Sequence, residues 1–143
     1  MASKKVVCSE IPAPEGSYAH ARKVGDWLYL SGIGPHQVNS QEVPGIRVNP
    51  DGRIHAHDMT EQARATFKNV EVLLQEAGAT LKNVVDVVVY LTDIKNDYKV
   101  FCKVFDEVFR DIDPTRTLAE VRFLHGKAAL QVKVTAFLGE CVD

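Results

Sequence analysis

An apolar stripe between residues 59 and 77 constrains the fold of this 143-residue chain more than any other feature. Apolar side chains recur there at spacings of three and four residues, at Met59, Ala63, Phe67, Val70, Leu74 and Ala77. This spacing places them on one side of an α-helix, which must then pack against another element. Asp58 and Glu61 resemble a capping pair at its start, and Gly78 is placed as a stop. This helix is the clearest element that the sequence predicts.

The residues that follow predict a buried strand and a second helix. Residues 84–91, VVDVVVYL, are almost continuously β-branched, which is typical of a buried strand. Asp86 interrupts the run and is expected at the start of the strand or on an exposed edge. Residues 97–110 carry a wide apolar stripe, with Asp97 as the expected N-cap. A strand between two amphipathic helices indicates a layered fold.

Further strands are predicted at both ends of the chain. YAHARKV and WLYLSG flank the turn pair Gly25-Asp26 and predict a hairpin. Residues 34–58 contain three prolines and are expected to hold short strand pieces at most. TLAEVRFL and AALQVKVTAFL both alternate, with Gly126 as the turn between them. The predicted fold is one α+β domain, residues 1–143, in which two helices cover one face of a mixed sheet.

Composition excludes several classes of function. Hydrophobic residues make up 45% and charged residues 25%, as in ordinary globular proteins. The net charge of −2 gives no basic field to attract nucleic acid, and no apolar run approaches the roughly 20 residues that span a membrane. No signal peptide is visible. Three widely spaced cysteines, Cys8, Cys102 and Cys141, argue against a disulfide framework. We expect a cytoplasmic protein with reduced thiols.

Arg116 is the most conspicuous charged residue in this pattern. It follows the turn residues Asp113-Pro114 and stands at the beginning of an alternating strand. An arginine at such a place is most often a solvated charge at the rim of the sheet. The alternative is a planar guanidinium directed at a carboxylate, which it can bind through two parallel hydrogen bonds. The residues alone leave both interpretations open.

Several segments in order along the chain resemble one family. DPTRTLAEVRFL followed by ALQVKVTAFLG resembles the closing signature of the RidA/YjgF/UK114 family of small deaminases. GSYAHARKVGDWLYLSGIGP resembles the family's opening hairpin. TFKNVEVLLQEAGATLKNVVDVVVYLTDI resembles its first helix and central strand. SGIGP, the PGI near residue 45 and VYLTDIKNDYKVF are most similar to the 2-aminomuconate deaminase branch.

The resemblance implies a chorismate mutase-like α+β fold assembled as a homotrimer, with sites in clefts between neighbouring subunits. By this resemblance Arg116 pairs with the carboxylate of an imine or enamine acid, Tyr18 closes the cleft, and backbone near Gly32 contributes. The other positions matched to substrate-binding residues are Ser31, Leu118 and Cys102. No metal and no organic cofactor takes part in the implied reaction.

The chain departs from the family at the residue expected to handle the proton. Fifteen residues after Arg116 the family has a glutamate that orients the attacking water, and this chain has Gln131. Glutamine donates and accepts hydrogen bonds but cannot take a proton near neutral pH. The family often has asparagine where Cys102 stands and cysteine where Leu118 stands. Arg116, Gln131 and Tyr18 remain the predicted catalytic residues.

Two functions are therefore carried forward from the sequence. The first is a hydrolytic deaminase of a 2-aminomuconate-like or 2-aminoacrylate-like acid. The second is a non-catalytic protein that binds small carboxylates. A third activity attached to the family, endoribonuclease, is disfavoured by the net charge of −2 and the lack of a basic, aromatic stripe.

The five histidines yield one weaker expectation. His20 and His36 are expected near the cleft, and contact with a second carboxylate of the substrate is the disfavoured alternative for them. His55 and His57 would share one face of a strand. No further ligand stands at a usable spacing from that pair, which argues against a zinc site.

Overall fold

The main sheet of the protein is mixed and has six strands, in the order β1-β2-β3-β8-β6-β7. The computed structural model describes residues 3–40 and 42–140. The strands span Ser3–Val6 (β1), Ala21–Val24 (β2), Trp27–Leu30 (β3), Val84–Leu91 (β6), Thr115–Glu120 (β7) and Leu130–Phe137 (β8). Neighbouring strands are antiparallel except β6 and β7, which run parallel. The predicted mixed sheet is confirmed, although β1 was not anticipated.

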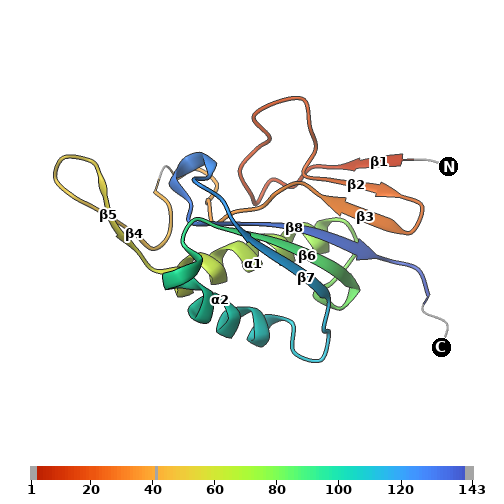
Figure 1. Cartoon of the computed structure of the whole chain (residues 1–143). Helices are drawn as coiled ribbons and strands as arrows, with labels where there is room; N and C mark the ends of the chain where they lie inside the picture. Colours follow the sequence, from red (N-terminus) through yellow and green to blue (C-terminus); the bar gives the residue numbers. More distant parts are fainter. Residues whose placement is uncertain (1–2, 41, 141–143) are drawn as a thin grey trace.

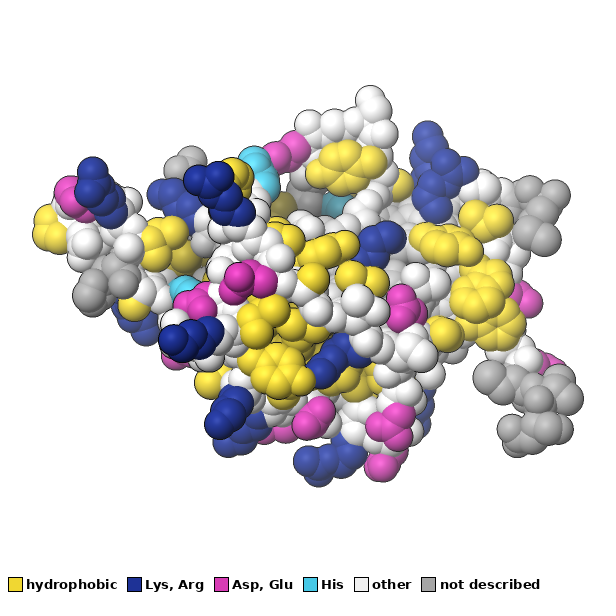
Figure 2. Space-filling view, viewed as in Figure 1, with side chains coloured by type: hydrophobic (Ala, Val, Ile, Leu, Met, Phe, Trp, Pro, Cys, Tyr) yellow, Lys and Arg dark blue, Asp and Glu magenta, His cyan; other side chains and the backbone are white. Residues whose placement is uncertain are grey.

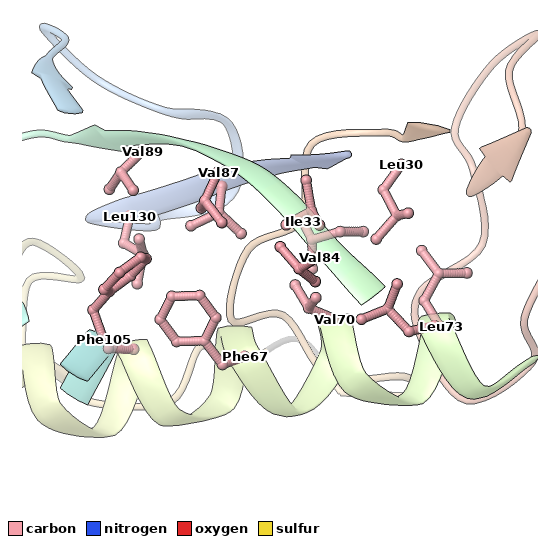
Figure 3. Close-up of a cluster of buried hydrophobic side chains, with 14 of the residues drawn as sticks. Leu30, Ile33, Phe67, Val70, Leu73, Val84, Val87, Val89, Phe105 and Leu130 are labelled. Atoms are coloured by element: carbon pink, nitrogen blue, oxygen red, sulfur yellow. The ribbon is translucent and has the colours of Figure 1, made fainter. Parts of the chain in front are cut away.

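Two helices, α1 (Met59–Glu76) and α2 (Ile94–Val108), lie on one face of this sheet, as predicted (Figure 1). Apolar side chains of α1 and of the sheet meet in one buried cluster (Figure 3). Phe67 of α1 contacts the rings of Phe101, Phe105 and Phe109, with ring centroids 5.4 to 6.0 Å apart. The opposite face of the sheet carries no helix, and no helix among the described residues is long and apolar enough to cross a membrane.

The ends of α1 agree with the sequence, whereas the start of α2 does not. Asp58 accepts a hydrogen bond from the backbone N–H of Glu61 at 3.1 Å, and Gly78 adopts a φ of +84° just beyond the helix. Helix α2 begins three residues earlier than expected because Asp93, not Asp97, caps it. Asp93 accepts from both the backbone and the side chain of Asn96, and these bonds hold the pKa of Asp93 below its usual value.

Asp97 therefore lies inside the first turn of α2, where it is buried. Its carboxylate is 2.6 Å from Nε2 of His57. His57 ends β5 (Ile54–His57), which pairs with β4 (Ile46–Val48) in a separate two-stranded sheet that projects from the molecule (Figure 1). The short strand pieces expected in residues 34–58 are these two strands. The Asp97–His57 contact ties them to α2.

Strands β7 and β8 are not neighbours, although only a short turn separates them in the sequence. The turn contains the 3₁₀ segment His125–Lys127, and Gly126 has a φ of +72°. Strand β6 lies between the two strands, parallel to β7 and antiparallel to β8. Asp86 lies half-buried within β6, not at its start, and accepts a hydrogen bond from Thr115 of β7 at 2.6 Å. This topology places Arg116 on the edge strand and Gln131 inside the sheet.

Candidate functional site

Three of the predicted site residues, Tyr18, Gly32 and Gln131, line one pocket of about 480 Å³. Its walls come from the loop that joins β1 and β2, the segment after β3, the start of β8 and the turn at residues 125–127. Figure 2 shows the molecule hollowed beneath the β1–β2 loop. A volume of this size falls within the range of about 300–1,000 Å³ that is usual for small-molecule pockets. We call it the glutamine pocket.

Gln131 reaches this pocket because of its register on β8. Leu130 and Val132 on either side are fully buried toward the helices, so Gln131 faces the other side of the sheet. Its amide lies against Gly32. A Cβ atom on residue 32 would stand 2.8 Å from the Gln131 Cδ, closer than such atoms approach in proteins. Glycine at position 32 therefore allows the Gln131 amide to lie beside the backbone that follows β3.

Tyr18 lies in the β1–β2 loop, and His20 holds this loop in place. The Tyr18 ring is 55% exposed, and its hydroxyl accepts a hydrogen bond from the Glu15 N–H at 3.1 Å. The His20 ring is buried, and its Nδ1 accepts from the Cys8 N–H at 2.8 Å. The proton of the neutral ring is then on Nε2, which donates to the Pro12 carbonyl at 2.7 Å. Both ring nitrogens of His20 therefore bind backbone, which agrees with the low weight given to a contact between His20 and the substrate.

Ser31 has a similar structural role. Its hydroxyl donates to the Ala19 carbonyl at 2.6 Å, and its N–H donates to the carbonyl of His20. These bonds fasten the end of the β1–β2 loop to the residue before Gly32. Ser31 lines a neighbouring pocket, which it shares with Tyr18, and not the glutamine pocket itself.

Arg116 lies in a second group of predicted residues, beside α2. Its guanidinium donates to the Cys102 sulfur at 3.7 Å and to the Tyr98 hydroxyl at 3.4 Å. The guanidinium carbon is 4.9 Å from the centroid of the Phe105 ring, within the range of a cation–π contact. Leu118, two residues further along β7, packs at the edge of the core. No carboxylate of the described residues forms an ion pair with Arg116.

The two groups of residues lie on opposite faces of the sheet. Arg116 pairs in register with Val87, whose side chain is buried toward the helices. Gln131 pairs in register with Tyr90, three residues further along β6 and therefore on the other face. One copy of the chain consequently does not bring the Arg116 guanidinium to the glutamine pocket.

Several polar residues of the glutamine pocket were missed by the sequence reasoning. Asn69 of α1 is buried and donates to the carbonyls of Gly34 and His36, which fixes the segment after β3. Asn69 lies next to Val70 on the buried side of α1, and a polar residue at such a position could have indicated its role from the sequence. Across the mouth of the pocket, the Glu15 carboxylate lies 3.1 Å from Nε2 of His125. This contact joins the β1–β2 loop to the turn before β8.

His36, expected near the cleft, does line the glutamine pocket, and its Nε2 donates to the carbonyl of Gly126 at 3.0 Å. Cys8 and Cys102 are free thiols, while Cys141 lies outside the described residues. No group of three or more metal-ligating side chains occurs in residues 3–40 and 42–140.

Comparison with known proteins identifies the family. The model of the family described as endoribonuclease L-PSP matches residues 8–138. A RutC family protein of Pyrococcus abyssi is 31% identical, with 96% of this chain and 98% of that protein covered. The 2-iminobutanoate/2-iminopropanoate deaminase of Rattus norvegicus is 29% identical over 95% of this chain and 90% of its own length.

A solved structure shows the same fold. The crystal structure of E. coli TdcF with bound serine superimposes with a TM-score of 0.80 at 23% identity, and covers 94% of this chain and 98% of TdcF. The match of the family model over residues 8–138, which contain both helices and every described strand except β1, carries the assignment. This chain belongs to the endoribonuclease L-PSP family, which is the RidA/YjgF family.

Proposed function

We propose that the protein is a hydrolytic deaminase of imine or enamine carboxylic acids, with a site completed by a second copy of the chain. The observation that carries the proposal is the placement of the two residue groups. Arg116, at the edge of one copy, has no carboxylate partner among the described residues, and Gln131 lines a pocket on the other face. The rat deaminase in the same family supports the reaction class.

In the proposed reaction Arg116 of one copy binds the substrate carboxylate through its planar guanidinium. The Gln131 amide and the backbone at Gly32 of the neighbouring copy orient a water molecule toward the imine carbon. A C–O bond forms, the electron pair of the C=N bond moves to nitrogen, and that nitrogen gains a proton. The hydroxyl proton of the resulting carbinolamine passes to the nitrogen, the C–N bond breaks, and ammonia leaves as the C=O bond forms. The products are a 2-oxo acid and ammonia.

Gln131 makes the proton transfer the demanding part of this scheme. Its amide can hold the water but cannot accept the proton that the water loses. In this chain the proton must pass to bulk water or directly to the departing nitrogen. We therefore expect turnover to be slower than in relatives with a glutamate. The loss should not exceed the roughly 10²–10⁴-fold that acid–base groups contribute.

The experiment that tests the proposal measures ammonia release from imines generated in the reaction vessel. We expect release above the buffer rate with 2-aminoacrylate or its 2-iminopropanoate tautomer. 2-Aminomuconate is the second substrate to try, because SGIGP and VYLTDIKNDYKVF are similar to that branch of the family. A rate equal to that of buffer for both would contradict the enzyme.

The second candidate function is a non-catalytic binder of small carboxylates, and Gln131 is the observation that favours it. A binder would retain Arg116 and the pocket without an acid–base group. Calorimetric titration with 2-oxobutyrate and benzoate separates the two functions. Binding of either acid without any ammonia release would establish the binder.

A further inference from the structure

A second pocket, of about 690 Å³, lies beside the glutamine pocket, and Tyr18 lines both. It opens on the face of the sheet that carries no helix. Its lining includes Lys5, Arg22 and Lys133 and, among the described residues, no carboxylate. Figure 2 shows Lys and Arg side chains over the β1–β2 end of the molecule. We call this site the basic pocket, and the deaminase reaction makes no use of its cations.

Two of the three cations stand at directly opposite positions on neighbouring strands. Lys5 of β1 is the register partner of Arg22 of β2, and both side chains are exposed. Like charges at directly opposite positions of an antiparallel pair destabilise the pair. Lys133 of β8 adds a third positive charge to the same pocket. Such a concentration is unexpected in a chain whose net charge is −2.

Two of the three cationic groups, Arg22 and Lys133, bind neighbouring oxygen atoms that do not belong to acids. Arg22 Nε donates to the Ser3 hydroxyl at 2.9 Å, and Lys133 Nζ donates to the Leu30 carbonyl. None of the three cations forms an ion pair with a described residue. A lysine keeps two further N–H donors after one hydrogen bond, and a guanidinium keeps several. The donors that remain are available to an anion.

Protection of the sheet edge explains only part of this pattern. Lysines on edge strands such as β1 discourage pairing with other chains. Lys4 and Lys23 form a second like-charge pair between β1 and β2, and neither lines the basic pocket. Lys133, however, lies on β8, which has a strand on each side. Edge protection therefore does not account for the third cation.

We propose that the basic pocket binds the phosphate group of a small phosphorylated metabolite. Phosphate oxygens accept charge-assisted hydrogen bonds from guanidinium and ammonium groups, and a doubly charged anion suits three cations. The volume exceeds that of phosphate itself. Tyr18 and Tyr29, both about half exposed, flank the pocket and offer aromatic surface to the organic part of the ligand.

Inorganic phosphate is the probe for this site, with chloride at equal ionic strength as the reference. Calorimetry should show one phosphate per chain, and phosphate should raise the melting temperature of the protein by on the order of 3 °C near saturation. Arg22→Gln and Lys133→Gln should each weaken phosphate binding about tenfold or more. Imine hydrolysis by these two variants is measured alongside, to show that their glutamine pockets are intact.

For Lys5→Gln, the difference in melting temperature from the parent should change sign between chloride and phosphate. A folding defect would lower the melting temperature in both salts. In chloride, Lys5→Gln should melt at the same temperature as the parent or higher, because a like-charge repulsion is removed. In phosphate it should melt below the parent. Lys23→Gln is the matched control: it relieves the other like-charge pair, so its difference from the parent should be the same in both salts.

Two results would overturn the proposal. One is unchanged phosphate affinity in both Arg22→Gln and Lys133→Gln. The other is a loss of assembly in these variants, seen by light scattering, without any phosphate binding by the parent. That result would mean that the cations pair with carboxylates of a second copy of the chain.

Discussion

At the scale of single residues, Gln131 is the main departure from the family, because the resemblance implies a glutamate at this position. The residue lies where the pocket requires it, with the amide against Gly32 and on the face opposite the helices. Its geometry suits the orientation of water. Its chemistry does not suit the removal of a proton. Glutamine in place of the family's glutamate therefore keeps a group that can orient the water but removes the group that could accept its proton.

Gln131→Glu should raise the rate of imine hydrolysis, by on the order of the 10²–10⁴-fold typical of acid–base groups. Glutamate and glutamine have nearly the same size, so packing against Gly32 should be retained. The rate is measured at saturating substrate, because a new anion near the bound carboxylate weakens substrate binding. An unchanged rate would mean that other residues, first Cys102 and Leu118, also limit the reaction.

Arg116→Lys tests the role of the guanidinium without removing its charge. A lysine cannot form two parallel hydrogen bonds to a carboxylate, so affinity for 2-oxobutyrate should fall by about 1.5–3 kcal/mol. Stability should change little, because Arg116 forms no ion pair with a described residue. Calorimetry gives the affinity, and Arg110→Lys in the exposed turn after α2 is the control. Equal affinity for 2-oxobutyrate in both variants would favour the other interpretation, in which Arg116 is a solvated charge at the rim of the sheet.

At the scale of elements, the site depends on three loops held by polar contacts, two of which are made by buried side chains. His20 fixes the β1–β2 loop, Asn69 fixes the segment after β3, and the Glu15–His125 contact links the first loop to the turn before β8. Buried side chains that bind backbone in this way are expensive to remove, because the backbone groups lose their partners. The shape of the glutamine pocket is therefore set outside the strands.

His20 offers a test of this arrangement. His20→Leu leaves the Cys8 N–H and the Pro12 carbonyl without partners, and should lower the free energy of unfolding by about 2–4 kcal/mol. His20→Asn keeps an acceptor for the Cys8 N–H and should recover part of the loss. If the loop positions Tyr18, the KM for imine substrates should rise in His20→Leu and fall back in His20→Asn. Urea unfolding and steady-state kinetics measure the two effects, and identical behaviour of both variants would contradict the assignment.

At the scale of the whole molecule, the face of the sheet without helices is the unfinished part. Trp27 is 40% exposed there, and the rings of Trp27 and Phe137 lie 4.8 Å apart. Figure 2 shows hydrophobic side chains gathered over β2, β3 and the end of β8. An exposed apolar patch of this kind favours association with another protein surface. We propose that further copies of the chain cover the patch around Trp27 and Phe137 in a homotrimer, at the end of β3 and β8 away from the basic pocket.

Subunit mixing tests the trimer and the shared site together. Arg116→Ala and Tyr18→Ala should each lose carboxylate binding, because each lacks one half of the site. Trimers formed at random from equal amounts of the two should regain about a quarter of the sites, since each neighbour pair has one productive arrangement in four. Light scattering should give the mass of three chains. No recovery in a proven mixed trimer would mean that the two halves do not meet.

The sequence by itself determined the helices and most strands, because each depends on local spacing of apolar residues and on turn residues nearby. The family was predicted from the resemblance of several segments in order along the chain. The stripe of α1, its cap at Asp58 and the buried run of β6 are of this kind. Only the tertiary structure decided that β6 lies between β7 and β8, and hence that Arg116 and Gln131 face opposite sides of the sheet. Strand order follows from long-range packing, which no short segment of sequence encodes. The roles of His20, Asp97 and Asn69 were decided in the same way, because their partners lie 8 to 40 residues away.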